Sequence, residues 1–280
     1  MIKYFIICRR RPDFTRERFF YEWAFIHVAL MLLTPPSMRR FRRYVQHFGN
    51  ADIPGPSCLL PPPHQRWEAL SEHWIEQLET TSPGPEYVEQ MQPHSFSDPA
   101  MEVTYVQGTS VYRRPDFRSG GIKLVHRLEP RAGQDLDASR RYWRDVHAPL
   151  VTHTLRDRGL RRYELDTPCD FDPAQFRRNR RGTLFDQVSI EPPLGIEELW
   201  FDSLDQALQL GLDPGLRATL GASYARFADV PHSYSMYLNE RVVFDFVTPG
   251  EQTPPPAVLA PGSLEAQVFR TGRPYHEPHI

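Results

Sequence analysis

The chain has 280 residues, 40% of them hydrophobic, with 33 basic and 35 acidic side chains and a formal net charge of −2. This composition excludes a disordered chain, which would combine low hydrophobicity with high net charge, and it argues against a nucleic-acid-binding protein. The three cysteines, Cys8, Cys58 and Cys169, are odd in number and far apart, which excludes a disulfide framework and a zinc ribbon. The length favours two domains over one.

No segment is long enough to span a bilayer, because the longest apolar run contains His27 and stops before Pro35. The N-terminal apolar run leads into three consecutive arginines without a small-residue cleavage site, so no signal peptide is predicted. We therefore expect a soluble cytoplasmic protein without a membrane partner.

Hydrophobic periodicity predicts the same elements twice along the chain. Each series begins with a strand, a helix and a second strand, predicted at residues 2–9, 15–33 and 40–47, and again at 121–128, 136–156 and 160–166. Third strands are expected within 67–75 and 186–201, and fourth strands at 105–113 and 234–246. A capping-box pattern at residues 203–206 opens a further helix that extends to about Phe227. The order β-α-β-β-α-β is that of a ferredoxin-like unit.

Matching residues recur in the same order in the two series, at intervals of 119 to 126 residues. The matched pairs are Lys3 and Lys123, Trp23 and Trp143, His27 and His147, Tyr44 and Tyr163, and Trp74 and Trp200. We therefore predict two repeats, residues 1–117 and 118–247, followed by a proline-rich arm at 248–280. Two ferredoxin-like repeats in one chain can pack sheet to sheet, as two subunits of a homodimer would.

The block Tyr142-Trp143-Arg-Asp-Val-His147-Ala-Pro-Leu-Val151, followed by Arg-Arg-Tyr on the next strand, resembles the EthD family. The first repeat departs from it, with Val28-Ala29 where the second has Ala148-Pro149. The resemblance implies an α+β fold in which the two tandem ferredoxin-like repeats form an intramolecular dimeric α+β barrel. It also implies a small-molecule site between the helices and the sheet of a repeat, in a superfamily of dehydratases, decarboxylases, cyclases, cofactor-free monooxygenases and haem enzymes.

His147 and His27 are the first catalytic candidates. A histidine four residues after a tryptophan shares its helix face, and an imidazole there can move protons near neutral pH. The alternative is a structural histidine that ties the helix to the sheet. Tyr163 and Tyr44 on the second strands are candidates to hold an enolate oxygen, or are ordinary core aromatics.

The expected walls of a substrate site are aromatic. Four tryptophans are candidates for substrate binding, with packing of the helix–sheet layer as the alternative role: Trp143, Trp23, Trp200 and Trp74. His126 on the first strand of the second repeat is a further candidate, because it alternates with the apolar Ile122 and Leu124. The arginine-rich stretch 177–181 is read as a solvated loop.

We expect no cofactor and no metal, because the sequence has no glycine-rich phosphate loop and no metal-ligand motif. The sequence therefore predicts a cofactor-independent acid–base enzyme of dehydratase, decarboxylase or cyclase type that acts on an aromatic or polyketide-like small molecule. The alternatives are a cofactor-free or haem-assisted monooxygenase in the same cleft and a non-catalytic binding protein for a hydrophobic metabolite. A homodimer is compatible with any of the three.

Overall fold

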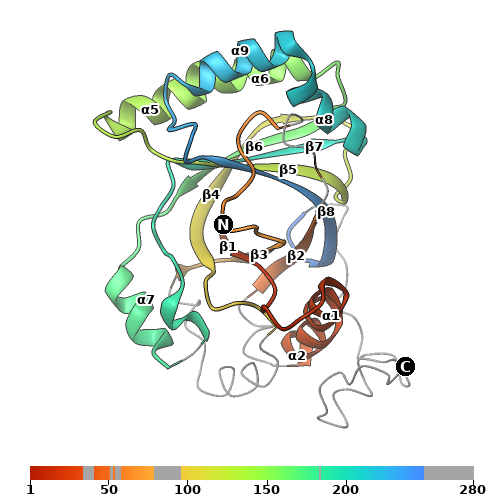
Figure 1. Ribbon diagram of the computed structural model, residues 1–280, viewed down its shortest axis with the longest axis vertical. Coiled ribbons are helices and arrows are strands. Elements are labelled where there is room, and N and C mark those ends of the chain that lie inside the picture. The colour runs from red at the N-terminus through yellow and green to blue at the C-terminus, as the bar shows by residue number, and fades with distance from the viewer. Residues whose placement is uncertain (34–40, 51–52, 54–57, 79–95, 183, 249–280) are drawn as a thin grey trace.

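A closed barrel of antiparallel strands forms the centre of the molecule (Figure 1). The computed structural model describes residues 1–33, 41–50, 53, 58–78, 96–182 and 184–248, so the expected proline-rich arm lies outside the described residues. The strands are β1 (Ile2–Cys8), β2 (Phe41–Gly49), β3 (Ala69–Ile75), β4 (Glu102–Arg113), β5 (Gly121–Leu128), β6 (Leu160–Pro168), β7 (Gly195–Phe201) and β8 (Tyr234–Asp245). Around the barrel they follow the order β1-β3-β2-β8-β5-β7-β6-β4.

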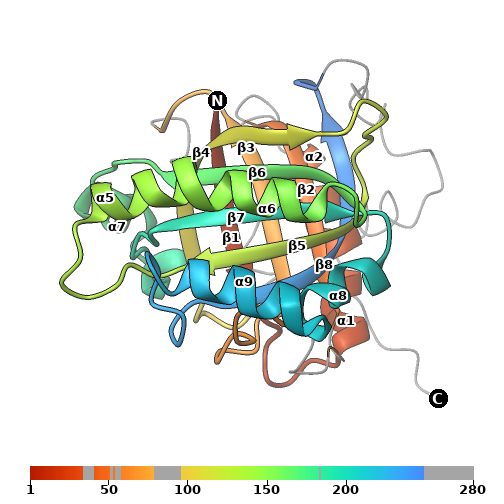
Figure 2. The same cartoon turned by 90° about the horizontal axis from the view of Figure 1, so that it is seen from above.

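The helices cover the outside of this barrel. Those of the first half are α1 (Arg16–Tyr21), the π-helical turn η1 (Glu22–His27) and α2 (Val28–Leu33). Those of the second half are α5 (Leu136–Tyr142), the π-helical turn η5 (Trp143–His147), α6 (Ala148–Leu155), α7 (Pro173–Arg180), the short 3₁₀ turn η6 (Leu184–Gln187), α8 (Leu204–Leu212) and α9 (Pro214–Tyr224). Figure 2 shows α5, α6, α8 and α9 lying across one wall of the barrel, while α1 and α2 cover the opposite wall in Figure 1.

Local signals in the sequence explain where the helices begin. The side chains of Thr15 and Asp135 cap α1 and α5 by accepting hydrogen bonds from the backbone N–H groups of Arg18 and Asp137. Ser203 caps α8 in the same way through Gln206 N–H, as the capping-box pattern predicts. The predicted mixed α and β composition and the predicted strand positions are confirmed, with boundary shifts of a few residues.

The arginine-rich stretch 177–181 was wrongly predicted as a loop. Residues up to Arg180 belong to α7, which starts at Pro173 and is capped by the carboxylate of Asp172. An aspartate before a proline is a helix-start signal, since proline at the first helical position has no N–H to leave unpaired. The prediction gave more weight to the charge of the arginines than to this helix-start signal.

Successive residues along each strand point to opposite sides of the barrel wall. On β7, Glu197 points outward to the helices of the second half, whereas Glu198 points inward. The inward-facing residues fill the barrel lumen, and the outward-facing ones pack under helices in two separate hydrophobic cores. The wall thus separates two chemical environments that share the same strands.

One end of the lumen is apolar and the other is charged. The apolar end is a cluster of buried residues that includes Phe5, Ile7, Leu70, Val125, Ile196 and Leu238. The charged end contains Lys3 and Lys123, the two lysines of the chain, both essentially fully buried. No helix in the described parts of the chain has the length and hydropathy that a membrane span requires.

Candidate active site beneath the helices of the second half

The outward face of β7 carries a buried carboxylate, Glu197, directly opposite His126 on β5 in the strand register. Its Oε1 atom accepts hydrogen bonds from Trp143 Nε1 at 2.6 Å and from the Tyr163 hydroxyl at 2.7 Å. Its Oε2 atom accepts one from the Tyr224 hydroxyl and lies 3.1 Å from His126 Nδ1. One carboxylate therefore gathers side chains from β5, η5, β6 and α9.

His147 lies against the same carboxylate and is fully buried. Its Nε2 atom is 3.4 Å from Glu197 Oε1, and its Nδ1 atom is 2.8 Å from Ser223 Oγ. Ser223 Oγ is in turn 3.5 Å from the hydroxyl of the half-buried Tyr142. These contacts link the edge of the helix layer through Ser223 to His147, whose Nε2 atom faces Glu197 without a hydrogen bond to the described residues.

His126 has one engaged ring nitrogen and one unpaired one. Nδ1 is 2.7 Å from the Tyr224 hydroxyl and 3.1 Å from Glu197 Oε2, whereas Nε2 has no hydrogen-bond partner among the described residues. The Tyr224 hydroxyl already donates to Glu197, so Nδ1 carries a proton, and in a neutral imidazole Nε2 is then the atom with the lone pair. A buried imidazole with a fixed tautomer and a free basic nitrogen is suited to accept a proton.

Trp143 and His147 reach the sheet from a π-helical turn, η5. The wider turn departs from the α-helical spacing on which the prediction relied, yet both side chains are buried toward the sheet. The first half has the same kind of turn at Glu22–His27. The residue that matches Pro149 there is Ala29, two positions after the turn. The proline is therefore not the cause of the π-helical turn, and turns of this kind are frequent at functional sites.

Burial and hydrogen bonding act in opposite directions on these groups. Burial raises the pKa of Glu197, but attraction to the imidazoles of His147 and His126 and the hydrogen bond from Tyr224 outweigh it and lower this pKa to about 2. Burial lowers the pKa of His147, although Glu197 counteracts it. Burial and the nearby carboxylate together raise the pKa of Tyr163 well above its usual value. At neutral pH the site thus holds an anionic carboxylate, a neutral His147 and a protonated phenol.

The first half has a matching tryptophan and tyrosine but no carboxylate at the position of Glu197. Ser71 stands where the second half has Glu197, and its register partner is Ile6 in place of His126. Trp23 Nε1 donates to Ser71 Oγ at 3.1 Å. Tyr44 is buried and accepts a hydrogen bond from Gln46 Nε2 at 3.1 Å.

The ring of His27 lies edge-on to Phe96 at a centroid distance of 5.1 Å. The structure thus gathers His147, His126, Tyr163 and Trp143 into one cluster and places Trp23, His27 and Tyr44 in the equivalent layer of the first half.

Trp74 and Trp200 point to the other side of the wall, into the lumen. Trp74 Nε1 donates to Glu72 and Trp200 Nε1 donates to Glu240. Their expected place in the helix–sheet layer was wrong, because inward and outward positions alternate and these tryptophans share a face with Glu72 and Glu198.

Three members of the cluster were missed from the sequence: Glu197, Ser223 and Tyr224. Glu197 was overlooked because the matched pair on these strands, Trp74 and Trp200, lies on the inward face, whereas Glu197 lies on the outward face. The strand alternation could have identified it, since Glu197 is the outward partner of His126. Ser223 and Tyr224 lie on α9, in a stretch for which no matching residues were found in the first repeat, so sequence repetition offered no signal.

Carboxylates and histidine also meet in the lumen. Among the described residues, His47, Glu72 and Glu198 offer ligand atoms within 4.8 Å of one another, as do Glu164, Asp166 and Glu198. These two groups lie on the inward face of the wall.

Comparison with known proteins adds a family to this geometry. The chain is similar in fold to a proposed monooxygenase from Fusobacterium nucleatum subsp. nucleatum, with 8% identity over 86% of this chain and 93% of that one and a TM-score of 0.48. It is also similar to chlorite dismutase from Candidatus Nitrospira defluvii, with 10% identity over 85% of this chain and 90% of that one and a TM-score of 0.43. Likenesses at this level say nothing about the reaction. A search of curated proteins finds no match.

The family profile of the EthD domain matches residues 131–231. The matched segment contains Trp143, His147, Tyr163, Glu197 and Tyr224, while His126 lies just before it. The resemblance noted in the sequence is therefore confirmed over this segment, which matches the EthD domain.

Proposed function

We propose that the chain is a cofactor-independent acid–base enzyme that acts on an aromatic or polyketide-like small molecule by dehydration, decarboxylation or cyclisation. The observation that carries the proposal is the shared carboxylate. Glu197 holds His126 and His147 at 3.1 and 3.4 Å in a buried, aromatic setting. Two imidazoles on one carboxylate can accept a proton at one position of a substrate and return it at another.

The role of each residue follows from its contacts. Glu197 fixes the proton of His126 on Nδ1, so Nε2 is the basic atom that removes a proton from an acidic carbon or a phenol. His147 exchanges protons with Ser223 and, through it, with the outer edge of the helix layer near Tyr142. The phenol of Tyr163, held protonated, donates its hydrogen bond to Glu197 and steadies the charge of that carboxylate.

The substrate class follows from the rings around the imidazoles. His147 packs against Tyr224 and Phe227 at centroid distances of 4.2 and 5.0 Å, and Tyr142 packs on Phe227 at 5.7 Å. Flat apolar side chains of this kind favour a planar, conjugated ligand, which would stack on them and place its reacting carbon toward the imidazoles. Both ring nitrogens of His147 face protein groups, which favours a proton carrier over an iron ligand and so speaks against a haem-assisted reaction.

We also infer that the barrel is built from two ferredoxin-like repeats, residues 1–117 and 118–247. The strand order within the first half is β4-β1-β3-β2, and within the second it is β8-β5-β7-β6, which is the same order position by position. The halves join where β2 pairs with β8 and β4 with β6. This arrangement supports a duplication in which only the second repeat keeps a carboxylate under its helices.

Deuterium exchange into a simple aromatic ketone tests the proposed function. We expect the protein to accelerate exchange of the acidic C–H protons of 2-tetralone, followed by NMR, and we expect His126→Gln to lower the rate by about 100-fold or more, the size of a typical general-base contribution. Ser71→Ala, at the first-half position that matches Glu197, is the control and should exchange at the wild-type rate. An unchanged rate in His126→Gln, or no acceleration by the wild-type protein, would contradict the acid–base proposal.

A further inference from the structure

The charged end of the lumen contains more buried carboxyl groups than buried permanent cations among the described residues. The carboxyl groups are Glu72, Glu164, Asp166, Glu198, Glu240 and Asp245, and the cations are Lys3, Arg43, Lys123 and Arg162. With every carboxyl ionised, this end of the lumen would carry two uncompensated negative charges. Leaving charges unpaired in a dry interior costs several kcal/mol each, so protons or a bound cation must compensate this excess. Burial raises the pKa of Asp166 well above its usual value, which lets that carboxyl keep one proton.

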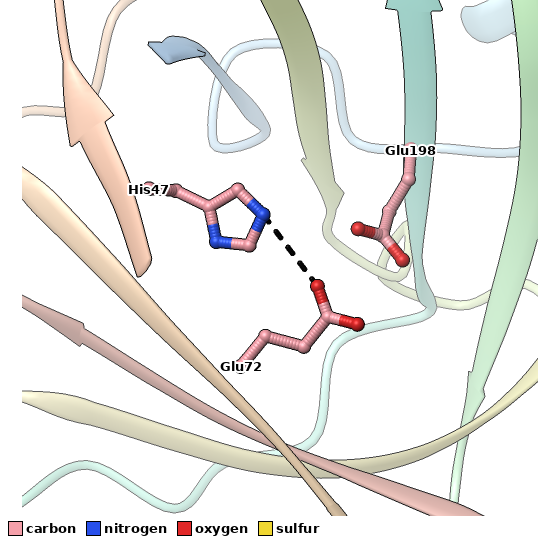
Figure 3. A group of neighbouring side chains, drawn as sticks. All are labelled: His47, Glu72 and Glu198. Atoms are coloured by element: carbon pink, nitrogen blue, oxygen red, sulfur yellow. Dashed lines mark ion pairs between the residues drawn. The ribbon is translucent and has the colours of Figure 1, made fainter. Parts of the chain in front are cut away.

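His47 shows where such a charge would lie. Its Nδ1 atom is 3.1 Å from the carbonyl oxygen of Leu70, which can only accept, so Nδ1 carries a proton. Nε2 has no hydrogen-bond partner among the described residues, although the ring is fully buried. Figure 3 shows this nitrogen directed at the carboxylate of Glu72, with Glu198 beside it. A neutral imidazole would therefore point its lone pair at negatively charged oxygens, which is repulsive.

The separations favour a metal ion over a proton at this position. His47 Nε2 is 3.5 Å from Glu72 Oε2 and 3.7 Å from Glu240 Oε2. Both separations exceed the hydrogen-bond range of about 2.7–3.2 Å. They approach the spacing of about 3.4 Å between two ligands of one tetrahedral zinc ion, each bonded at about 2.0–2.2 Å.

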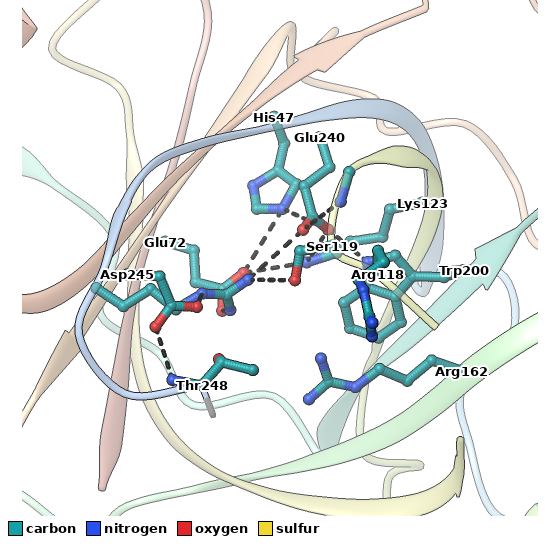
Figure 4. Close-up of polar contacts among 12 residues, drawn as sticks. His47, Glu72, Arg118, Ser119, Lys123, Arg162, Trp200, Glu240, Asp245 and Thr248 are labelled. Carbon is teal, nitrogen blue, oxygen red and sulfur yellow. Dashed lines mark hydrogen bonds and ion pairs between the residues drawn. The ribbon is translucent and has the colours of Figure 1, made fainter. Parts of the chain in front are cut away.

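The surroundings of these carboxylates also fit a metal centre. Glu72 accepts a hydrogen bond from Trp74 and Glu240 accepts one from Trp200, while the Leu70 carbonyl orients His47. Outer partners of this kind hold metal ligands in place and set the tautomer of a ligating histidine. Figure 4 shows His47, Glu72 and Glu240 converging in the lumen with Lys123 and Trp200 around them.

We propose that His47, Glu72 and Glu198 form a binding site for a divalent cation of the zinc class in the barrel lumen, with Glu240 next to it as a further ligand. Imidazole together with carboxylates suits zinc and neighbouring transition metals. The ion would offset the excess negative charge of the lumen and tie together β2, β3 and β7, which carry the three ligands. This site faces the lumen, so the inference does not depend on the proposed function of the helix-side cluster.

The ammonium group of Lys123 would compete with this cation for the carboxylate oxygens. This ammonium lies 3.0 Å from Glu72 Oε2 and also contacts Glu198. A divalent ion and this ammonium therefore compete for the same oxygens, and removing the ammonium should strengthen metal binding. This gives the proposal a second variant whose expected effect has the opposite sign.

The test is a zinc titration of the full chain without an affinity tag, stripped of metal with a chelator and followed by calorimetry. We expect one zinc ion per chain, binding at least about 100-fold weaker in His47→Gln, because removal of a supporting or direct ligand costs this much or more. His232→Gln, at an exposed histidine, is the matched control and should bind like the wild type. Lys123→Met should bind more tightly than the wild type.

Two results would overturn the proposal: no saturable zinc binding by the wild-type protein, or equal binding by His47→Gln. Circular dichroism establishes that each variant is folded. If His47→Gln does not fold, an anomalous-difference map of wild-type crystals grown with zinc decides the question without any variant. A peak between His47 and Glu72 supports the site, and peaks confined to surface histidines refute it.

Discussion

The helix-facing sides of the two halves share a tryptophan, a histidine and a tyrosine but differ in the group that these residues surround. In the second half, a carboxylate receives hydrogen bonds from an indole and two phenols and lies against two imidazoles. In the first half, the serine at that position meets one indole, and an isoleucine replaces the partner histidine. The tryptophan, the histidine of the π-helical turn and the strand tyrosine occur in both halves, so these three residues do not by themselves define a reactive site.

The difference between the halves shows which buried residues must occur together to compensate a carboxylate. A buried carboxylate is costly unless several donors compensate it, so Glu197 is tolerated only together with His126 and Tyr224. Where Ile6 replaces the histidine, a short neutral hydroxyl is enough to satisfy the tryptophan. The occurrence of Glu197 with His126 therefore separates the half with acid–base potential from the half with a structural core.

The largest expected contrast is in stability when the central acceptor is removed from each half. Glu197→Ala should lower the free energy of unfolding by about 3–5 kcal/mol, because it leaves several buried donors without an acceptor. Ser71→Ala removes the acceptor of one indole and should cost about 1 kcal/mol. Urea denaturation followed by fluorescence measures both. Equal losses would show that the two positions are equivalent and that the comparison is wrong.

A second contrast concerns the room that each half leaves for its tryptophan. Gly195 begins β7, and a Cβ atom there would lie 2.3 Å from a ring carbon of Trp143. The matching residue of the first half is Ala69, which is buried beside Trp23 in the same core. Gly195→Ala should therefore destabilise the protein by about 1–3 kcal/mol through overpacking and displace the Trp143 indole from Glu197.

Ala69→Gly is the matched substitution in the opposite direction. It removes one buried methyl group and adds backbone freedom, and we expect a loss of about 1 kcal/mol. Thermal unfolding measures the stability of both variants, and the exchange rate of the Trp143 indole proton reports its hydrogen bond. A Gly195→Ala protein as stable as the wild type would mean that the indole can move at no cost.

The smallest expected effect is on pH dependence. Burial lowers the pKa of His147, so below the usual imidazole pKa of about 6.5 the unfolded chain takes up a proton that the folded chain refuses. The contribution of His147 to stability is therefore full at pH values above about 6.5 and is lost as the pH falls.

His147→Gln should flatten the loss of stability below pH 6.5 by up to about 1 kcal/mol per pH unit. Denaturation midpoints measured from pH 5 to pH 8 check the prediction. A slope in His147→Gln equal to that of the wild type would show that His147 does not refuse the proton.

The sequence predicts most of the secondary structure because its signals are local. Strand alternation, helix caps and the recurring Trp-to-His spacing each depend on residues a few positions apart, and the cap at Ser203 was identified on this basis. The same local logic failed for α7, where the arginines suggested a solvated loop. It also could not place Trp74 and Trp200, because the side of a barrel wall that a residue faces depends on how the sheet closes.

The sequence by itself determined that the chain repeats a β-α-β-β pattern and that His147 and Trp143 share a helix surface. Only the tertiary structure decided that His126 and Glu197, 71 positions apart, meet in one register, and that His47, Glu72 and Glu198 converge from three strands. The physical reason is barrel closure. It fixes long-range register through backbone pairing, and that register sets which polar groups are buried together and must compensate one another.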